Sequence, residues 1–172
     1  MAKPKPGTFN SHYDEYVNQV TEADIKQALA IREERIGNVF SSIAESRTEK
    51  GYAPGKWTLK DLLQHLIDCE RIFCYRALCI ARGEQKSLPG FDDGPYAQMA
   101  AANRRSWASL CEEFDAVRKT TKMLFDSFSD ADMERSGLAN NHPITVLALG
   151  YITLGHAYHH IRIVKERYLT AL

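Results

Sequence analysis

Four stretches of the chain repeat apolar residues with the spacing of an α-helix, and each is bounded by residues that favour helix ends. They run from about residue 21 to 46, from 58 to 82, from about 95 to 128 and from 143 to about 168. No alternation of apolar and polar residues is long enough to predict a strand. Four amphipathic helices of similar length predict an all-α protein, a four-helix bundle.

The helix boundaries carry local signals of their own. Thr58 is a good N-cap with Asp61 three residues later, and Thr21 with Asp24 gives a similar start to the first helix. After Gly83 comes a long connection between the second and third helices, which allows the chain to cross over the bundle. We expect a break or bend near Asn103, because one helix over residues 95–128 would be about 51 Å long.

The first half of the last helix, from Ile144 to Gly155, is apolar nearly all round. It is well short of the roughly 20 residues that cross a bilayer, so we expect no membrane span. Such a segment is either enclosed by neighbouring helices or packed against a second subunit. We therefore expect a homodimer built on bundle faces.

The size and charge of the chain suit a single globular domain. Its 172 residues predict an N-terminal arm over residues 1–20 and the bundle over residues 21–170. Lys plus Arg equal Asp plus Glu at 22 each, so no basic surface indicates nucleic acid. The first residues lack the apolar core of a signal peptide. We expect a cytoplasmic protein.

The four cysteines are expected to be free thiols. Cys69, Cys74 and Cys79 lie in one predicted helix and Cys111 in another. The five-residue steps between the first three turn each about 140° from the last, so they share no face. They predict no thiolate metal cluster.

Three of the six histidines fall within five positions of the last helix: His156, His159 and His160. His156 and His160 point within about 40° of each other on a helix, so both imidazoles can reach one metal ion. His159 could compete through its three-residue spacing from His156. The alternative is that these histidines only interact favourably with the helix end.

A third ligand has to come from a facing helix, and His65 is the other histidine inside a predicted helix. It lies at the edge of that helix's apolar stripe and points partly into the bundle, where facing ligands meet. The alternative is a core-edge histidine bonded to a neighbour. We interpret His12, in an irregular arm, and His142, before the proline that opens the last helix, as surface or capping residues.

The segment "GKWTLKDLLQHLIDCE", followed about ninety residues later by "GHAYHHIRIV", resembles the DinB/YfiT-like family of four-helix-bundle metalloenzymes. The resemblance covers almost the whole chain. Its specific features are Trp57 and Thr58 before the second helix, a histidine in an "HL-x-D" context, and a final His-x-x-x-His. Carried over residue by residue, it implies metal ligands at His65, His156 and His160, with His159 as a neighbour that does not bind the ion. No departure at the ligand positions is visible.

Three imidazoles leave a divalent ion an open position, which is typical of catalytic sites. Zinc or nickel suits such a site best, and iron also accepts imidazole. Asp68, three residues past His65, is the candidate catalytic residue, as a proton acceptor or as a carboxylate that orients a ligand. The alternative for Asp68 is a solvated surface carboxylate. Glu70 is expected to be surface charge, and Asp92 and Asp93 to be turn residues.

The resemblance implies a thiol-dependent transferase or a hydrolase that acts on a small molecule, with a low-molecular-weight thiol as a second partner. A metal-binding, stress-responsive bundle without turnover is the rival hypothesis. A plain dimeric bundle with incidental histidines is the third.

Overall fold

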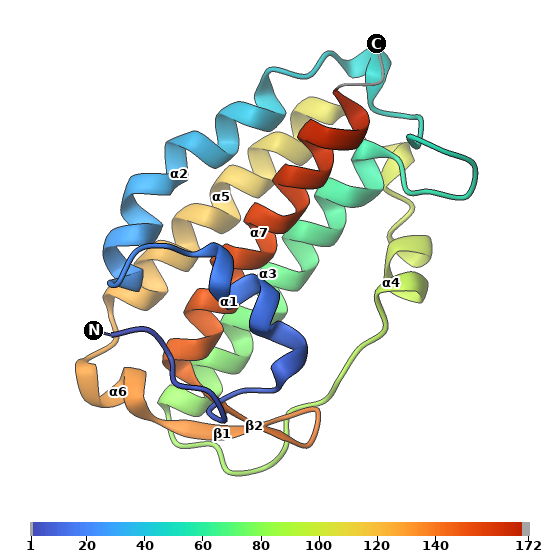
Figure 1. Cartoon of the computed structure of the whole chain (residues 1–172). Coiled ribbons are helices and arrows are strands. Elements are labelled where there is room, and N and C mark those ends of the chain that lie inside the picture. Colours follow the sequence, from blue (N-terminus) through green and yellow to red (C-terminus); the bar gives the residue numbers. More distant parts are fainter. Residues whose placement is uncertain (1, 170–172) are drawn as a thin grey trace.

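A computed structural model describes residues 2–169, and the side chains at 31–35 and 37 lie outside that description. Four long helices pack side by side in it (Figure 1): α2 (Ile25–Ser41), α3 (Leu59–Ala81), α5 (Trp107–Asp126) and α7 (Val146–Ile163). Their apolar faces meet in one core. The predicted all-α four-helix bundle is confirmed.

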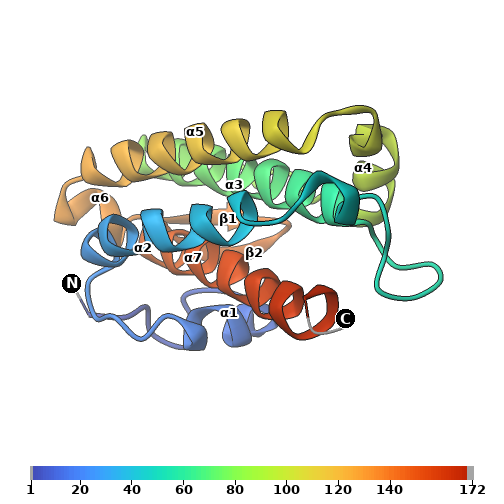
Figure 2. The same ribbon diagram turned by 90° about the horizontal axis from the view of Figure 1, so that it is seen from above.

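The order of the helices around the bundle is not that of a simple up-and-down chain. α3 packs against α5 and α7, and α2 packs against the same two helices. In Figure 1, α2 and α7 run toward the top of the view, whereas α3 and α5 both run toward the bottom. Seen from above, α3 and α5 form one layer and α2 and α7 the other (Figure 2). Because α3 and α5 are parallel neighbours, the connection between them returns along the bundle, as the long segment after Gly83 predicted.

That connection carries the short helix α4 (Asp93–Ala100), which lies against α3, and the 3-10 turn η3 (Ala102–Arg104). The chain then enters α5 through Ser106, whose side chain accepts a hydrogen bond from Ser109 N. The break expected near Asn103 is therefore confirmed, since residues 101–106 separate two helices.

The first helix starts later and ends earlier than predicted. Asp24, not Thr21, is the N-cap, because its side chain accepts a hydrogen bond from Gln27 N at 3.0 Å. α2 ends at Ser41, and a 3-10 turn, η2 (Glu45–Arg47), follows. At α3 the predicted cap is confirmed: Thr58 and Asp61 form a reciprocal capping box.

A β-hairpin precedes the last helix, where the sequence predicted none. After the short helix α6 (Asp130–Glu134), β1 (Ser136–Ala139) pairs antiparallel with β2 (His142–Thr145). Asn140 and Asn141 form the turn with φ of 51° and 61°, a conformation that Asn tolerates. The expected start at Pro143 was wrong, and α7 begins at Val146. His142 lies in a strand.

The N-terminal arm is partly helical: it holds the 3-10 turn η1 (Ser11–Tyr13) and helix α1 (Asp14–Gln19). α1 lies on the outer side of α7 (Figure 2). The two approach so closely that a Cβ at Gly155 would lie 1.9 Å from the carbonyl oxygen of Tyr16. The arm and bundle limits drawn from the sequence stay predictions, and residue 170 lies outside the described residues.

α7 is enclosed by its own chain. All of residues 146–157 except Leu147 are buried, and α1, α2 and α3 cover them. Enclosure thus accounts for the apolar surface that suggested a second subunit, and the homodimer stays a prediction. η4 (Val164–Tyr168) continues α7 with a π-helical turn. Among the described residues, no helix is both long and apolar enough to cross a membrane.

Candidate metal centre

His65 owes its position to the start of α3. The capping box at Thr58 begins the helix, and His65 then lies about two turns further along. Its side chain is buried, and its ring is 4.9 Å from that of Trp57, the residue just before the cap. The local signals at residues 57–61 therefore direct His65 into the bundle.

α7 contributes two imidazoles to the same place. His156 is 5% exposed, and its Nε2 is 3.1 Å from Nε2 of His160, one turn further along. The same His156 Nε2 is 3.1 Å from Nε2 of His65, which is 91 residues earlier in the chain. The rings of His65 and His160 are 4.9 Å apart. The structure thus brings the three predicted ligands into one cluster.

The spacing of these nitrogens suits a metal ion better than it suits hydrogen bonding. In a tetrahedral zinc site with bonds of about 2.0–2.1 Å, neighbouring ligand atoms are about 3.3–3.4 Å apart. His156 Nε2 faces two other Nε2 atoms, and a neutral imidazole offers only one donor proton. Nδ1 of His160 is buried with no hydrogen-bond partner among the described residues. A cation that accepts three lone pairs fits this arrangement.

Burial keeps the three imidazoles neutral. It lowers the pKa of His65, against a smaller opposing effect of the Asp93 carboxylate. Burial, and then the neighbouring histidines, lower the pKa of His156 well below its ordinary value and that of His160 to about 3. Their lone pairs are therefore available to a metal ion at neutral pH.

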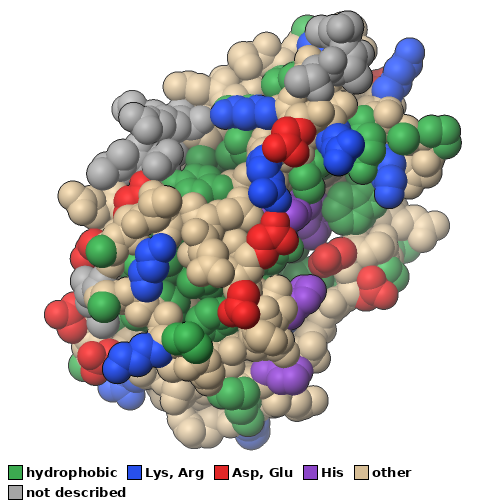
Figure 3. Space-filling view, viewed as in Figure 1, with side chains coloured by type: hydrophobic (Ala, Val, Ile, Leu, Met, Phe, Trp, Pro, Cys, Tyr) green, Lys and Arg blue, Asp and Glu red, His purple; other side chains and the backbone are tan. Residues whose placement is uncertain are grey.

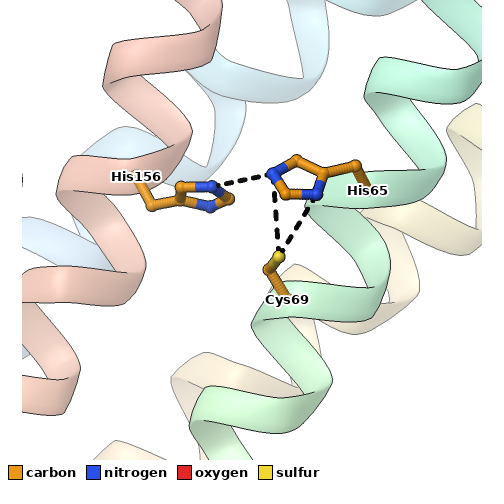
Figure 4. Close-up of side chains that lie close together, drawn as sticks. All are labelled: His65, Cys69 and His156. Atoms are coloured by element: carbon orange, nitrogen blue, oxygen red, sulfur yellow. Dashed lines mark hydrogen bonds between the residues drawn. The ribbon is translucent and has the colours of Figure 1, made fainter. Parts of the chain in front are cut away.

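Cys69 belongs to the cluster, although the sequence did not single it out. Figure 4 shows His65 and Cys69 together on α3 with His156 reaching toward them from α7. Cys69 Sγ is 3.4 Å from Nδ1 and 3.7 Å from Nε2 of His65, and the candidate donor atoms of Cys69, His65 and His156 lie within 4.8 Å of one another. Burial raises the pKa of the thiol, so Cys69 is protonated unless a cation is near. Its four-residue spacing from His65, the same as that of His156 and His160, was the available signal.

Aromatic rings line the cluster. The ring of Tyr16, on α1, is 5.3 Å from each of His156 and His159, and that of Phe73 is 5.8 Å from His156. Burial raises the pKa of Tyr16 to about 12, so its hydroxyl stays protonated. The N-terminal arm therefore supplies part of the wall.

His159 does not take part in the Nε2 contacts that join His65, His156 and His160. Its Nδ1 is 3.1 Å from Oε1 of Glu15, which also accepts a hydrogen bond from Arg162. Glu15 and Arg162 are exposed, so His159 belongs to a polar group at the edge of α1 and α7. His12 is exposed and its ring contacts Tyr13.

Asp68 is half-buried beside the cluster. Its Oδ1 accepts a hydrogen bond from Gln64 Nε2 at 2.9 Å, and among the described contacts it bonds to none of the histidines. Burial raises its pKa. With Gln64, Arg71 and Arg105 it lines a cavity of about 780 Å³ between α3 and α4.

The three other acidic positions considered from the sequence have different outcomes. Glu70 is not surface charge: it is 3% exposed and accepts hydrogen bonds from Arg118 and Thr121 of α5. Asp92 is the N-cap of α4, which agrees with the turn interpretation. The turn interpretation of Asp93 was wrong, because Asp93 is the first residue of that helix.

The cluster reaches the surface at one point. His160 lines a cavity of about 300 Å³ together with residues of the loop before α3. In the space-filling view, histidine side chains emerge on the face formed by α1, α7 and α3, next to hydrophobic side chains (Figure 3).

Comparisons with known proteins agree with this architecture. The model of the DinB superfamily matches residues 13–164. The solved structure of YfiT from Bacillus subtilis, described as a probable metal-dependent hydrolase with an unusual four-helix bundle topology, aligns at a TM-score of 0.74 with 14% identity, over 98% of this chain and 92% of that one.

A second solved structure, the mycothiol-dependent maleylpyruvate isomerase, aligns at a TM-score of 0.65 with 10% identity. The alignment covers 87% of this chain but 59% of that protein, so the chain matches only part of the isomerase. No curated protein matches the sequence at a significant level.

Proposed function

Because this chain belongs to the DinB superfamily, we propose that it is a metal-dependent enzyme whose divalent ion is held by His65, His156 and His160. One observation carries the proposal: Nε2 of the buried His156 lies 3.1 Å from Nε2 of His65 on α3 and 3.1 Å from Nε2 of the half-buried His160 on α7. Zinc and nickel suit these donors best, and iron is the third choice.

Three protein ligands leave a coordination position for a substrate. A divalent ion held in this way supplies the positive charge that ionises a bound water or thiol near neutral pH. We propose a thiol-dependent transfer or a hydrolysis on a small molecule, with a low-molecular-weight thiol as the second substrate. Of the two similar structures, one is described as a probable metal-dependent hydrolase, which supports hydrolysis, and the other as a mycothiol-dependent isomerase, which supports the use of a thiol.

Asp68 is the proposed proton acceptor. Burial raises its pKa, which makes it a stronger base than a solvated carboxylate, and it lines a cavity large enough for a small molecule. The Gln64 amide fixes one of its oxygens and leaves the other for a proton. Replacing Asp68 by Asn should therefore reduce turnover by about 10²–10⁴-fold while the metal stays bound.

The test of the ligand set is the metal content of protein purified without a histidine tag. His65→Ala, His156→Ala and His160→Ala should each lose most of the ion, because each removes one of three bonds. His159→Ala is the matched control and should retain it, since His159 pairs with Glu15. Circular dichroism of all four variants checks that they fold. A full metal content in His160→Ala together with an empty His159→Ala would overturn the assignment.

A metal-binding bundle without turnover is the second candidate. It is favoured by the burial of His65 and His156, which suits a structural ion as well as a catalytic one. Activity that disappears on chelation and returns with added metal would exclude it.

A further inference from the structure

The cavity of about 300 Å³ over His160 is the one described cavity with a histidine of the cluster in its wall. The much larger cavity beside Asp68 has no histidine in its lining. A molecule in the smaller cavity therefore lies directly against the proposed metal centre, whatever occupies the larger one. The chemistry of the smaller cavity's walls indicates which molecules fit it.

Three aromatic side chains form those walls: Tyr52, Trp57 and Tyr168. The rings of Tyr52 and Tyr168 meet edge to face at 5.1 Å, and the Tyr168 hydroxyl donates a hydrogen bond to the carbonyl oxygen of Trp57 at 2.6 Å. Arg47 donates to the backbone carbonyl of Tyr168 at 2.8 Å and fixes it further. The walls are thus held in place by their own contacts and favour a flat, aromatic guest.

The lining of this cavity contains one cationic side chain, that of the exposed Lys56. Burial raises the pKa of Tyr168 to about 12, so that phenol is neutral. The charge of the Asp61 carboxylate and the Tyr52 phenol also raise the pKa of Tyr168. This carboxylate accepts hydrogen bonds from Thr58 and Asn103. An anionic group of a ligand can therefore pair with Lys56.

We propose that this cavity binds an aromatic carboxylate, with its ring between Tyr52, Trp57 and Tyr168 and its carboxylate toward Lys56. The inference goes beyond the proposed function: it names a ligand class for the cavity over His160, which is a different cavity from the one that Asp68 lines. Binding itself rests on the loop before α3 and on Tyr168, so it does not require the ion.

Calorimetric titration with three small probes tests the proposal, on metal-free and on zinc-loaded protein. Benzoate carries both features, benzamide lacks the charge, and cyclohexanecarboxylate lacks the aromatic ring. Benzoate should bind to both forms of the protein. Each of the other two probes should bind at least about fivefold more weakly, the equivalent of one exposed ion pair or one aromatic contact.

Two pairs of variants locate the binding site. Lys56→Met should weaken benzoate about fivefold and leave benzamide unchanged, whereas Lys86→Met, in the exposed loop after α3, should change neither. Tyr52→Ala should weaken both aromatic probes, whereas Tyr75→Ala, an exposed tyrosine outside the cavity, should not. Circular dichroism of each variant confirms that it folds.

The outcomes separate this inference from the proposed function. Benzoate that binds no better than benzamide, or that fails to bind either form, overturns the inference. The inference is also overturned if benzoate binds only to zinc-loaded protein and its affinity is unchanged in Lys56→Met, because the carboxylate then binds the ion. A chain that takes up no metal but still binds benzoate through Lys56 contradicts the proposed function and supports the cavity's specificity.

Discussion

Cys69 and His65 lie one helical turn apart on α3, and their contact can serve the cluster in two ways. Sγ is 3.4 Å from Nδ1 of His65, the ring nitrogen that does not face His156. A metal-binding histidine usually donates its other ring N–H to a neighbouring acceptor, which fixes the tautomer and the ring. A thiol in that position orients His65, whereas an ionised one would be a ligand.

We expect Cys69 to orient His65 and not to bind the ion, since the proposed ligand set of His65, His156 and His160 already supplies three imidazoles. Cys69→Ser should keep the metal and weaken its affinity by roughly tenfold, the usual cost of losing such a partner. Cys74→Ser is the control, because Cys74 contacts Thr121 and no histidine of the cluster. Competition with a chelator measures both. Complete loss of metal in Cys69→Ser, with a thiolate-to-metal band in the cobalt-substituted protein, would make Cys69 a ligand.

Helical spacing pointed to His156 with His160, left His159 open, and placed His65 at the edge of an apolar stripe. The family resemblance then implied the set His65, His156 and His160. Cys69 was missed because its spacing was compared only with other cysteines. Tyr16 could not be found in this way, since its place beside His156 depends on how the arm crosses α7. Glu70 was misjudged because its burial depends on Arg118, a residue of another helix.

Among the helices, α3 and α5 are joined by an ion pair inside the protein. Arg118 and Glu70 are 2% and 4% exposed at their side chains, and Thr121 donates a further hydrogen bond to Glu70. A buried pair adds little net stability, but removing one partner leaves the other charge buried and unpaired. The pair therefore disfavours any packing of the parallel helices in which the two residues do not meet.

Arg118→Met should lower the free energy of unfolding by about 3–5 kcal/mol. The double variant Glu70→Leu, Arg118→Met should recover most of that loss, because no unpaired charge remains. Lys122→Met, which breaks an exposed pair with Asp126 on the same helix, should cost less than about 1 kcal/mol. Urea denaturation compares the three. A double variant as unstable as the single one would show that the ionic contact itself stabilises the protein.

The contact between α1 and α7 depends on a glycine. Glycine inside a helix is normally less favourable than alanine by about 1 kcal/mol, yet a Cβ at position 155 would strike the backbone of Tyr16. Gly155→Ala should therefore destabilise the protein by about 1–3 kcal/mol and displace Tyr16 from His156 and His159. Thermal unfolding and the intrinsic fluorescence of tyrosine report the two effects.

Gly150→Ala provides the comparison on the same helix. There the new Cβ would meet the side chains of Ile25 and Phe125 at 2.9 Å, and these can shift more easily than a backbone. The loss should be smaller, and the surroundings of Tyr16 should not change. An equal loss of stability in Gly155→Ala and Gly150→Ala would mean that the backbone of α1 shifts as easily as a side chain.

The spacing of apolar residues predicted the four long helices, but it did not predict the hairpin before α7. Each strand has four residues, too few for alternation to stand out, and the Asn140–Asn141 turn is its only strong local signal. The length of the connection after Gly83 allowed a crossover between α3 and α5 but did not predict the order of the helices. Which helices become neighbours depends on packing, which no single segment encodes.

For the molecule as a whole, three buried neutral histidines link stability to pH. The unfolded chain takes up protons on these imidazoles as the pH falls below about 6.5, whereas the folded chain resists because burial lowers each pKa, that of His160 to about 3. Their contribution to stability is complete above about pH 6.5 and is lost progressively below it. A buried imidazole contributes at most about 1.4 kcal/mol per pH unit, and only until the pH falls to its folded pKa, which for His160 is about 3.

Metal-free protein should therefore unfold at a clearly lower temperature at about pH 5 than at about pH 7.5. His160→Gln should reduce this dependence, because an imidazole whose pKa is lowered to about 3 in the folded protein is gone. His12→Gln, at an exposed position, should leave it unchanged. Calorimetric scans after chelation measure the three proteins. If the unfolding temperature changed with pH in the same way in all three proteins, the buried histidines would not be the cause of the pH dependence.

His65 and His156 are 91 residues apart, on helices that pack side by side. An ion bound to both ties the N-terminal part of α3 to the C-terminal part of α7, so the two cannot part locally without releasing it. Amide hydrogens along these two segments should then exchange with solvent more slowly in loaded than in metal-free protein, while those of α4 keep their rate. The rate of amide hydrogen exchange would then report whether the metal is bound, because the two segments open together and do so less often in loaded protein.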